Sequence, residues 1–146
     1  MSKSVWGEKT QYFSDLDPQT ILDSIDELGF NTTGRCLALN SMENRVYEVE
    51  IDIDFEAKSP SDHFKVAKFY RPGRWSEAQI REEHEFSHML KDNELPIIAP
   101  LKIDGESLFK AKNGLFFCLY DKQGGRVPDE MNKEQLERMG RLIARI

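Results

Sequence analysis

The sequence has few cysteines, no long apolar run and no leader-like beginning. Its two cysteines, Cys36 and Cys118, form no CxxC or metal-binding spacing, which favours reduced thiols in a cytoplasm over a disulfide framework. The longest apolar run covers residues 115–120, whereas a membrane span needs about 18 residues. Residues 1–11 are polar and mixed in charge, unlike a signal peptide. We therefore expect a cytoplasmic protein with no membrane partner.

An excess of positive charge is also missing. The 146 residues include 20 Lys and Arg against 26 Asp and Glu, a formal net charge of −6 at pH 7. Because the phosphate backbone of a nucleic acid binds basic surfaces, nucleic acid is not an expected partner. The length is that of one domain, and hydrophobic residues make up 39% of the chain, which is enough to close a core.

Three segments have the pattern of a helix. The first covers Pro18–Leu28 after a capping Asp17, and the second runs from a capping box at Ser76 to about Lys91. The third begins after Asn132 and repeats apolar residues at helical spacing to the last residue. Since that period continues to the end of the sequence, we interpret the last residue as a cut within a longer protein.

Short strand-like runs occupy much of the remaining sequence. They cover residues 36–39, 45–51, 63–70, 97–103, 107–110 and 114–120. The dipeptides Asp104-Gly105 and Asn113-Gly114 are typical of hairpin turns. A Gly124-Gly125 pair marks a flexible joint before the last helix. The order of strands and helices predicts an α+β domain with an antiparallel sheet.

One carboxylate of the second helix falls on its apolar side. A helical wheel places Glu83 within a stripe of apolar residues on one side of the helix, which are Ile80, Phe86, Met89 and Leu90. A carboxylate buried there without a partner would be costly, so we expect it to meet a cation, and Lys68 on the preceding strand is the best placed. Glu82 is the main alternative partner, and two separate solvated charges are the other interpretation. Kinases hold the phosphates of ATP with such a pair of a strand lysine and a helix glutamate.

The motifs around this pair resemble a family of bacterial stress response kinases. They lie at residues 39–47 (LNSMENRVY), 66–72 (VAKFYRP), 82–86 (EEHEF), 96–100 (PIIAP), 124–126 (GGR) and 139–146 (MGRLIARI). Their order and spacing are similar to the N-terminal lobe of that family, which consists of serine/threonine kinases related to the aminoglycoside and choline phosphotransferases. The resemblance extends over residues 13–146.

The resemblance implies an α+β fold of the protein-kinase-like N-lobe type. It has a twisted antiparallel sheet of about five strands, one helix packed on the sheet, an added N-terminal helix and the first helix after the hinge. The implied organisation is a flexible N-terminus at 1–12, the lobe at 13–121, a hinge or linker at 122–131, and at 132–146 a helix that leads toward a C-lobe absent from this chain.

The resemblance also implies an ATP-binding cleft. Lys68 is similar to the lysine that contacts the α- and β-phosphates, and Glu83 is similar to its helix partner. The turn at residues 40–45 would cover the phosphates, the backbone of 119–122 would pair with adenine, and two apolar side chains would enclose the base. The remaining expected residues are Ser41, Asn44 and Arg45 in the turn, Val46 and Ala67 as apolar walls, and Leu119, Tyr120 and Lys122 at the hinge.

The catalytic aspartate and asparagine of the family, and its Mg²⁺ aspartate, belong to the C-terminal lobe, and no matching segment occurs in this sequence. The implied parent protein transfers the γ-phosphoryl group of ATP to protein serine or threonine in stress response, with Mg²⁺ held by residues outside this chain. We expect the 146-residue chain alone to be inactive. The alternatives are a phosphotransferase for a small alcohol such as a sugar, choline or an aminoglycoside, and a non-catalytic module that binds a nucleotide or a partner.

A zinc-protease motif competes with this interpretation. Residues His84 to His88 match HExxH, in which two histidines bind zinc and the glutamate acts as a base. The wheel turns both histidines toward solvent, and no third histidine follows at metzincin spacing. We therefore expect no metal site.

The last helix presents apolar side chains without an evident partner. Leu136, Ile143 and Ile146 share one side of it. An exposed apolar face favours self-association, which would give a dimer through this helix.

Overall fold

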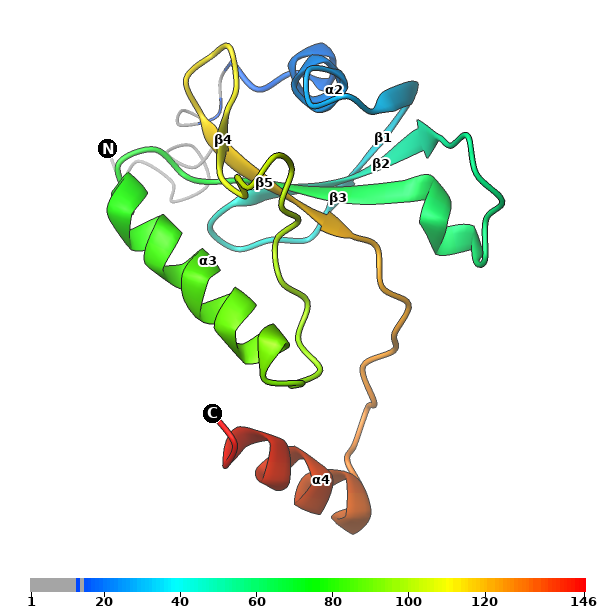
Figure 1. The fold of residues 1–146 in the computed structure, drawn as a ribbon, viewed down its shortest axis with the longest axis vertical. Coiled ribbons are helices and arrows are strands. Elements are labelled where there is room, and N and C mark those ends of the chain that lie inside the picture. The colour runs from blue at the N-terminus through cyan, green and yellow to red at the C-terminus, as the bar shows by residue number, and fades with distance from the viewer. Residues whose placement is uncertain (1–12, 14) are drawn as a thin grey trace, which may run out of the picture.

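A five-stranded antiparallel sheet forms the centre of the computed structural model, which describes residue 13 and residues 15–146 (Figure 1). The strands lie in the order β1-β2-β3-β5-β4, and their bounds are Asn31–Leu39 for β1, Arg45–Asp52 for β2, Phe64–Phe69 for β3, Phe109–Lys110 for β4 and Phe116–Asp121 for β5. Every neighbouring pair is antiparallel. The flexible N-terminus expected at residues 1–12 lies outside the described residues.

The helices begin where the capping residues predict. They are α2 (Pro18–Asp26), α3 (Glu77–Asp92) and α4 (Lys133–Ile143), with a short 3₁₀ helix, η1, at Pro60–His63. The Asp17 side chain accepts a hydrogen bond from the Thr20 N–H at 2.7 Å, and Ser76 and Asn132 each form a capping box at the start of α3 and α4. With the sheet, these helices confirm the α+β fold predicted for a kinase-like N-lobe.

The two faces of the sheet are covered by different helices (Figure 1). On the face toward α2, here the α2 face, Ile21 and Ile25 pack with strand residues such as Phe69. On the other side, here the α3 face, Ile80 packs with Cys118. Alternate residues of β5 belong to the two clusters because side chains alternate along a strand. Within a strand, whether the residue number is odd or even therefore decides which face of the sheet the side chain lies on.

The strand predicted at residues 97–103 does not form. Only Ile103 makes a bridge there, with Glu106, around a turn in which Asp104 and Gly105 have positive φ angles, as a hairpin turn requires. The run starts directly after Pro96 and contains Pro100, and proline cannot donate a ladder hydrogen bond. The Leu101 N–H donates instead to the Leu119 carbonyl at 2.7 Å, which ties this segment to β5.

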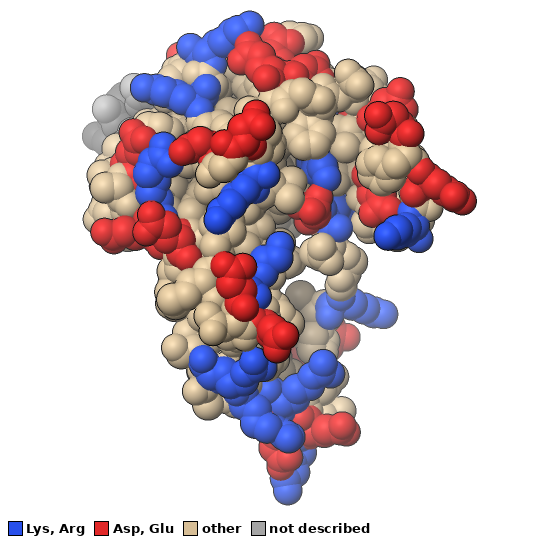
Figure 2. All heavy atoms as spheres, viewed as in Figure 1, with Lys and Arg blue, Asp and Glu red and all other residues tan. Residues whose placement is uncertain are grey.

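The last helix contributes no buried residue. Leu136, Met139 and Ile143 are exposed on it. Ile146 is exposed too, but the helix ends at Ile143, three residues short of the predicted end. The dimer through this helix stays a prediction. Figure 2 shows Lys and Arg side chains gathered over α4, at the end of the molecule opposite α2. Among the described residues, no helix is both long and apolar enough to cross a bilayer.

Candidate functional site

Lys68 and Glu83 meet on the α3 face. The Lys68 Nζ lies 3.4 Å from the Glu83 Oε1, so the predicted ion pair is present and its acidic partner is Glu83 rather than the neighbouring Glu82. The side chains are 21% and 53% exposed, respectively. The pair is therefore more open to solvent at Glu83, on the helix, than at Lys68, on the sheet.

The helical wheel was right about only part of the buried side of α3, because Ile80 and Leu90 are buried as it predicted. It placed Phe86 and Met89 inside and turned His84 toward solvent, but both apolar residues are about half exposed and His84 is only 2% exposed. Glu83 is consequently not a core carboxylate. The wheel failed because it ranks residues by polarity, whereas α3 packs on the sheet along a narrow edge where a polar side chain finds hydrogen-bond partners.

The surface beside Lys68 consists of side chains from the same face of the sheet. Strand register places Val46 and Cys118 opposite Lys68, and Val66 opposite Tyr120. Val46 therefore shares a face with Lys68, and its predicted role as an apolar wall stays a prediction. Val66, two residues before Lys68, shares its face because strand side chains alternate with a period of two. The sequence interpretation missed Val66, although this parity could have found it.

Ala67 was wrongly predicted as the second apolar wall. Its side chain is fully buried in the cluster that packs against α2, on the opposite face from Lys68. Leu119 is buried in the same cluster, so only its backbone is available near the α3 face, and its carbonyl already accepts from the Leu101 N–H. Both side chains stabilise the core instead of facing a ligand.

Arg45 also points away from Lys68. Its guanidinium carbon lies 5.2 Å from the centre of the Phe13 ring, a cation–π contact with a residue of the α2-side core. Since Val46 pairs directly with Lys68, the preceding residue must project to the other face. The Arg45 side chain is therefore directed away from the face of Lys68, and the predicted role of the Arg45 backbone in the phosphate-covering turn stays a prediction.

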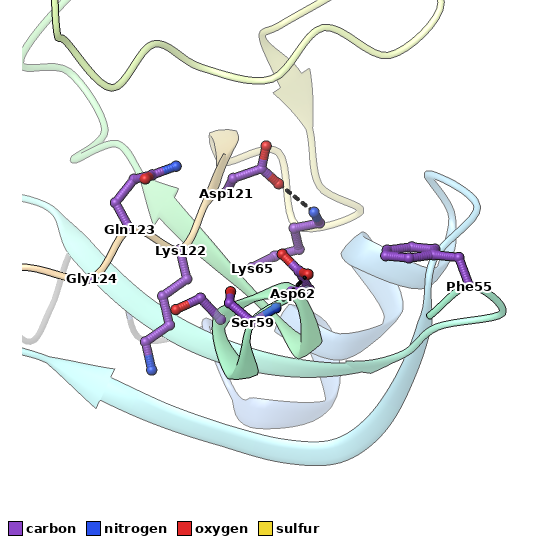
Figure 3. Close-up of a pocket in the computed structure, with 9 residues that line it drawn as sticks. Phe55, Ser59, Asp62, Lys65, Asp121, Lys122, Gln123 and Gly124 are labelled. Carbon is purple, nitrogen blue, oxygen red and sulfur yellow. Dashed lines mark hydrogen bonds and ion pairs between the residues drawn. The ribbon is translucent and has the colours of Figure 1, made fainter. Parts of the chain in front are cut away.

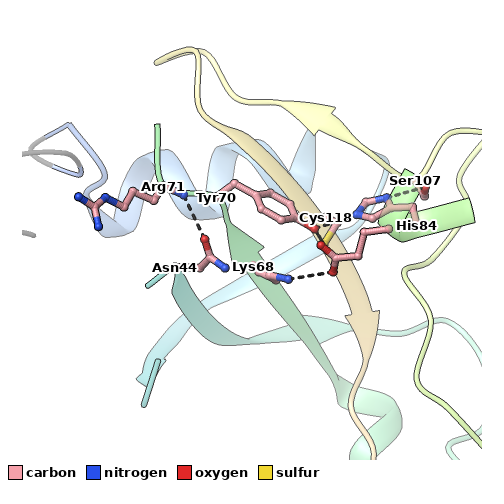
Figure 4. A network of polar contacts seen from close by, with 8 residues as sticks. Asn44, Lys68, Tyr70, Arg71, His84, Ser107 and Cys118 are labelled. Carbon is pink, nitrogen blue, oxygen red and sulfur yellow. Dashed lines mark hydrogen bonds and ion pairs between the residues drawn. The ribbon is translucent and has the colours of Figure 1, made fainter. Parts of the chain in front are cut away.

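The turn between β1 and β2 is tied to the loop that follows β3. The Asn44 Oδ1 accepts from the Arg71 N–H at 3.1 Å (Figure 4), and Glu43 pairs with Arg74 at 2.7 Å. Ser41 lies half-buried in this turn. These contacts hold the turn beside the end of β3, and the predicted roles of Ser41 and Asn44 toward phosphate stay predictions.

The segment that follows β5 is anchored on both faces of the sheet. The Lys122 Nζ lies 2.9 Å from the Glu48 Oε2 and 4.4 Å from the centre of the Phe64 ring. Asp121 forms an ion pair with Lys65 beside a cavity of about 310 Å³ near η1 (Figure 3). Lys68 does not line that cavity, so the cavity is separate from the Lys68–Glu83 pair.

A buried polar network adjoins the ion pair (Figure 4). The Tyr70 hydroxyl lies 2.8 Å from the His84 Nε2, and the His84 Nδ1 lies 2.9 Å from the Ser107 Oγ. The Tyr70 hydroxyl also lies 3.5 Å from the Cys118 Sγ. Burial lowers the pKa of His84 to about 4 and raises the pKa of Tyr70, so both groups are neutral at pH 7. The sequence interpretation missed this network.

The network also explains the HExxH motif. Both ring nitrogens of His84 have partners, and the His88 Nε2 lies 2.7 Å from the Pro100 carbonyl oxygen. The two histidines are thus packing residues of α3, not the solvent-facing side chains that the wheel predicted. In the part of the chain that the structure describes, no group of three or more His, Cys, Asp or Glu side chains could hold a metal ion.

The buried neutral histidine predicts an acid-labile fold. The pKa of His84 is about 4 in the folded chain and about 6.5 in an unfolded one, so the unfolded state binds more protons between these values. The stability conferred by neutral His84 is complete above pH 6.5 and falls below it, by about 2 kcal/mol at pH 5. Urea unfolding at pH 7.5 and pH 5 measures this difference.

Two histidine variants identify the source of that pH dependence. His84→Asn is expected to abolish most of it, whereas His63→Asn, a change at an exposed histidine, should leave it intact. Glu83, His88, Lys68 and Arg81 are the charged or titratable groups that act on His84. An equal loss of stability at pH 5 in the wild type and His84→Asn would contradict the assignment.

Comparison with known proteins matches residues 37–146 to the profile of the phosphotransferase enzyme family. The chain is 40% identical over 134 residues to "Stress response kinase A" of Salmonella typhi and to "Serine/threonine protein kinase RdoA" of Salmonella typhimurium. It is 37% identical to "Stress response kinase A" of Escherichia coli (strain K12). Each match covers 92% of this chain and 38% of the relative, so the chain spans well under half the length of these proteins.

Proposed function

The chain belongs to the phosphotransferase enzyme family, and from this membership we propose that it is the nucleotide-binding lobe of an ATP-dependent kinase. The proposed acceptor is a protein serine or threonine, in line with the name of one relative. The names of other relatives extend the proposal to a stress response, and the composition of the sequence extends it to the cytoplasm. The observation that supports the proposal best is the 3.4 Å contact between Lys68 and Glu83.

In the proposed site, Lys68 binds the α- and β-phosphates of ATP. An ammonium group neutralises phosphate charge and donates hydrogen bonds, and charged hydrogen bonds are among the strong ones. Glu83 orients the lysine, and because the lysine side chain is 21% exposed and its partner 53% exposed, the ammonium group can exchange part of its contact with Glu83 for phosphate. Val46, Val66 and Tyr120, which share its face, supply the surface for the base.

These residues perform only part of phosphoryl transfer, which depends on positioning and charge neutralisation at both the donor and the acceptor. Mg²⁺ would neutralise charge on the phosphates, but we assign no residue of this chain to it, because the carboxylate beside Lys68 is already paired with the lysine. We also assign no residue to orienting the acceptor hydroxyl. The 146-residue chain is therefore expected to bind ATP weakly and to transfer no phosphate.

Nucleotide titration of the chain tests the proposal. ATP and ADP are expected to bind at least about 10-fold more tightly than AMP, equivalent to about 1.4 kcal/mol, because AMP lacks the β-phosphate that Lys68 would contact. Isothermal titration calorimetry measures the three affinities. Equal affinities for ATP and AMP, or the absence of ATP binding, would reject the proposed site.

Backbone NMR locates the bound nucleotide. ATP should shift the amide signals of Val46, Val66 and Tyr120 on the α3 face more than those near Ile21 and Ile25 on the α2 side.

A phosphate-transfer assay identifies the acceptor. It uses a protein with the full length of the relatives and offers a protein acceptor and a small alcohol in parallel. The assay separates a serine/threonine kinase from a small-molecule phosphotransferase. Transfer only to the small alcohol would correct the proposed acceptor.

A further inference from the structure

The helix that carries Glu83 is attached to the rest of the chain by few buried residues. More exposed polar contacts add to them: Arg81 pairs with Glu106, and the His88 Nε2 lies 2.7 Å from the Pro100 carbonyl oxygen. Only Ile80, His84 and Leu90 are buried along its 16 residues. Ile80 and Leu90 contribute apolar contacts, which do not by themselves fix the rotation of a helix about its axis. His84 is the one buried polar residue of α3 in the described chain, and its hydrogen bonds are directional.

The His84 ring connects three separate segments. Its Nε2 contacts the Tyr70 hydroxyl at the end of β3, and its Nδ1 contacts the Ser107 hydroxyl in the segment before β4 (Figure 4). Because the ring is neutral, one nitrogen donates and the other accepts, and either hydroxyl can take the complementary role. Both nitrogens of the buried ring are therefore satisfied only when α3 has this rotation and this distance from the sheet.

Tyr70 contacts both the network and the ion pair. Its hydroxyl bonds His84, while the Lys68 Nζ lies 4.7 Å from the centre of its ring, within cation–π range. Glu83 directly precedes His84 in α3. The same tyrosine thus touches the lysine of the ion pair and the neighbour of its glutamate.

We propose that Tyr70 and His84 are positioning residues that hold Glu83 opposite Lys68 before the nucleotide binds. An ion pair whose carboxylate is 53% exposed is too weak to fix a helix, whereas a buried polar group that loses its partner is strongly disfavoured. The network therefore sets the geometry, and the ion pair follows from it. The inference deepens the proposed function and rests on it for its effect on ATP.

Chemical crosslinking tests the positioning without any nucleotide. A carbodiimide joins a lysine to a carboxylate only when they are in contact, so the wild-type chain should give a Lys68–Glu83 crosslink detectable by mass spectrometry. Tyr70→Phe keeps the ring over Lys68 but removes the hydroxyl, and it is expected to lower the crosslink yield about 5-fold, within the range of coupled neighbours. Tyr47→Phe, the same change on the α2 face, should leave the yield unchanged.

Histidine variants provide a second measurement on the same crosslink. His84→Gln keeps a polar group that can bond Tyr70 and should retain more of the yield than His84→Ala. Circular dichroism verifies that each variant is folded at the assay temperature. An unchanged crosslink yield in folded Tyr70→Phe would overturn the proposal, whatever happens to ATP binding.

ATP affinity then separates a positioning role from a merely structural one. If Tyr70 acts through Glu83, Tyr70→Phe and Glu83→Gln should each weaken ATP binding, and the double variant should be no weaker than Glu83→Gln alone. Multiplying effects would show that the two residues act independently and would reject the positioning role. If the wild type binds no ATP while Tyr70→Phe still loses the crosslink, the proposed function fails and the positioning role stands.

Discussion

Lys68→Ala is expected to weaken ATP binding by this chain about 10- to 100-fold. A hydrogen bond to a charged group contributes about 1.5–3 kcal/mol, and Lys68 is the cation that meets Glu83 on the α3 face. The Lys68 side chain is 21% exposed, but its partner Glu83 is 53% exposed, and an ion pair open to solvent contributes little to stability. The removal of Lys68 should therefore change the free energy of unfolding less than it changes affinity. Calorimetric titration with ATP, together with urea unfolding, measures both quantities.

Lys65→Ala is the matched control for this prediction. Lys65 lies on the same strand three residues earlier, but its side chain projects to the other face and pairs with Asp121. The two variants lose the same charge, so any general effect of net charge on ATP affinity is the same in both. A loss of affinity in Lys65→Ala as large as that in Lys68→Ala would show that nucleotide binds elsewhere or only through net charge.

Local signals explain which parts of the fold the sequence predicts. The capping residues Asp17, Ser76 and Asn132 accept hydrogen bonds from residues three positions further along the chain. A short stretch of sequence is therefore enough to predict where α2, α3 and α4 begin. The pairing of Lys68 with Glu83 could also be predicted from the sequence. The two residues are joined by the end of a strand, a short loop and two turns of helix, which allow few relative positions.

The errors arose where a face of the molecule had to be chosen. Ala67 and Arg45 were assigned to the site from motif position. Because side chains alternate along a strand, both side chains lie on the α2 face, whereas those of Lys68 and Val46 lie on the α3 face. His84 was assigned to solvent because it is polar. Its burial depends on Tyr70 and Ser107, the latter 23 residues away in sequence, and periodicity within one helix contains no information about such partners.

Phe69→Ala is expected to lower the free energy of unfolding by about 3–5 kcal/mol, the typical cost of removing a buried aromatic side chain. Phe69 is fully buried, stacks on Phe117 with ring centres 5.1 Å apart and meets the Tyr47 ring edge-on. A domain of this size is stable by about 5–15 kcal/mol, so the variant should still fold at low temperature. Its urea unfolding midpoint measures the loss.

The same variant tests whether the two faces of the sheet have separate roles. Phe69 sits between Lys68 and Tyr70 in the sequence, but its side chain belongs to the α2-side core. At a temperature where Phe69→Ala is folded, its ATP affinity should therefore stay within about 2-fold of the wild type, which is a change in binding free energy of less than about 0.5 kcal/mol. The control for the effect of Phe69→Ala on stability is Phe55→Ala, at a phenylalanine that is 60% exposed. This control should change the free energy of unfolding by only about 0.5 kcal/mol. If folded Phe69→Ala lost ATP affinity as Lys68→Ala does, the separation between a structural α2 face and a ligand-binding α3 face would be wrong.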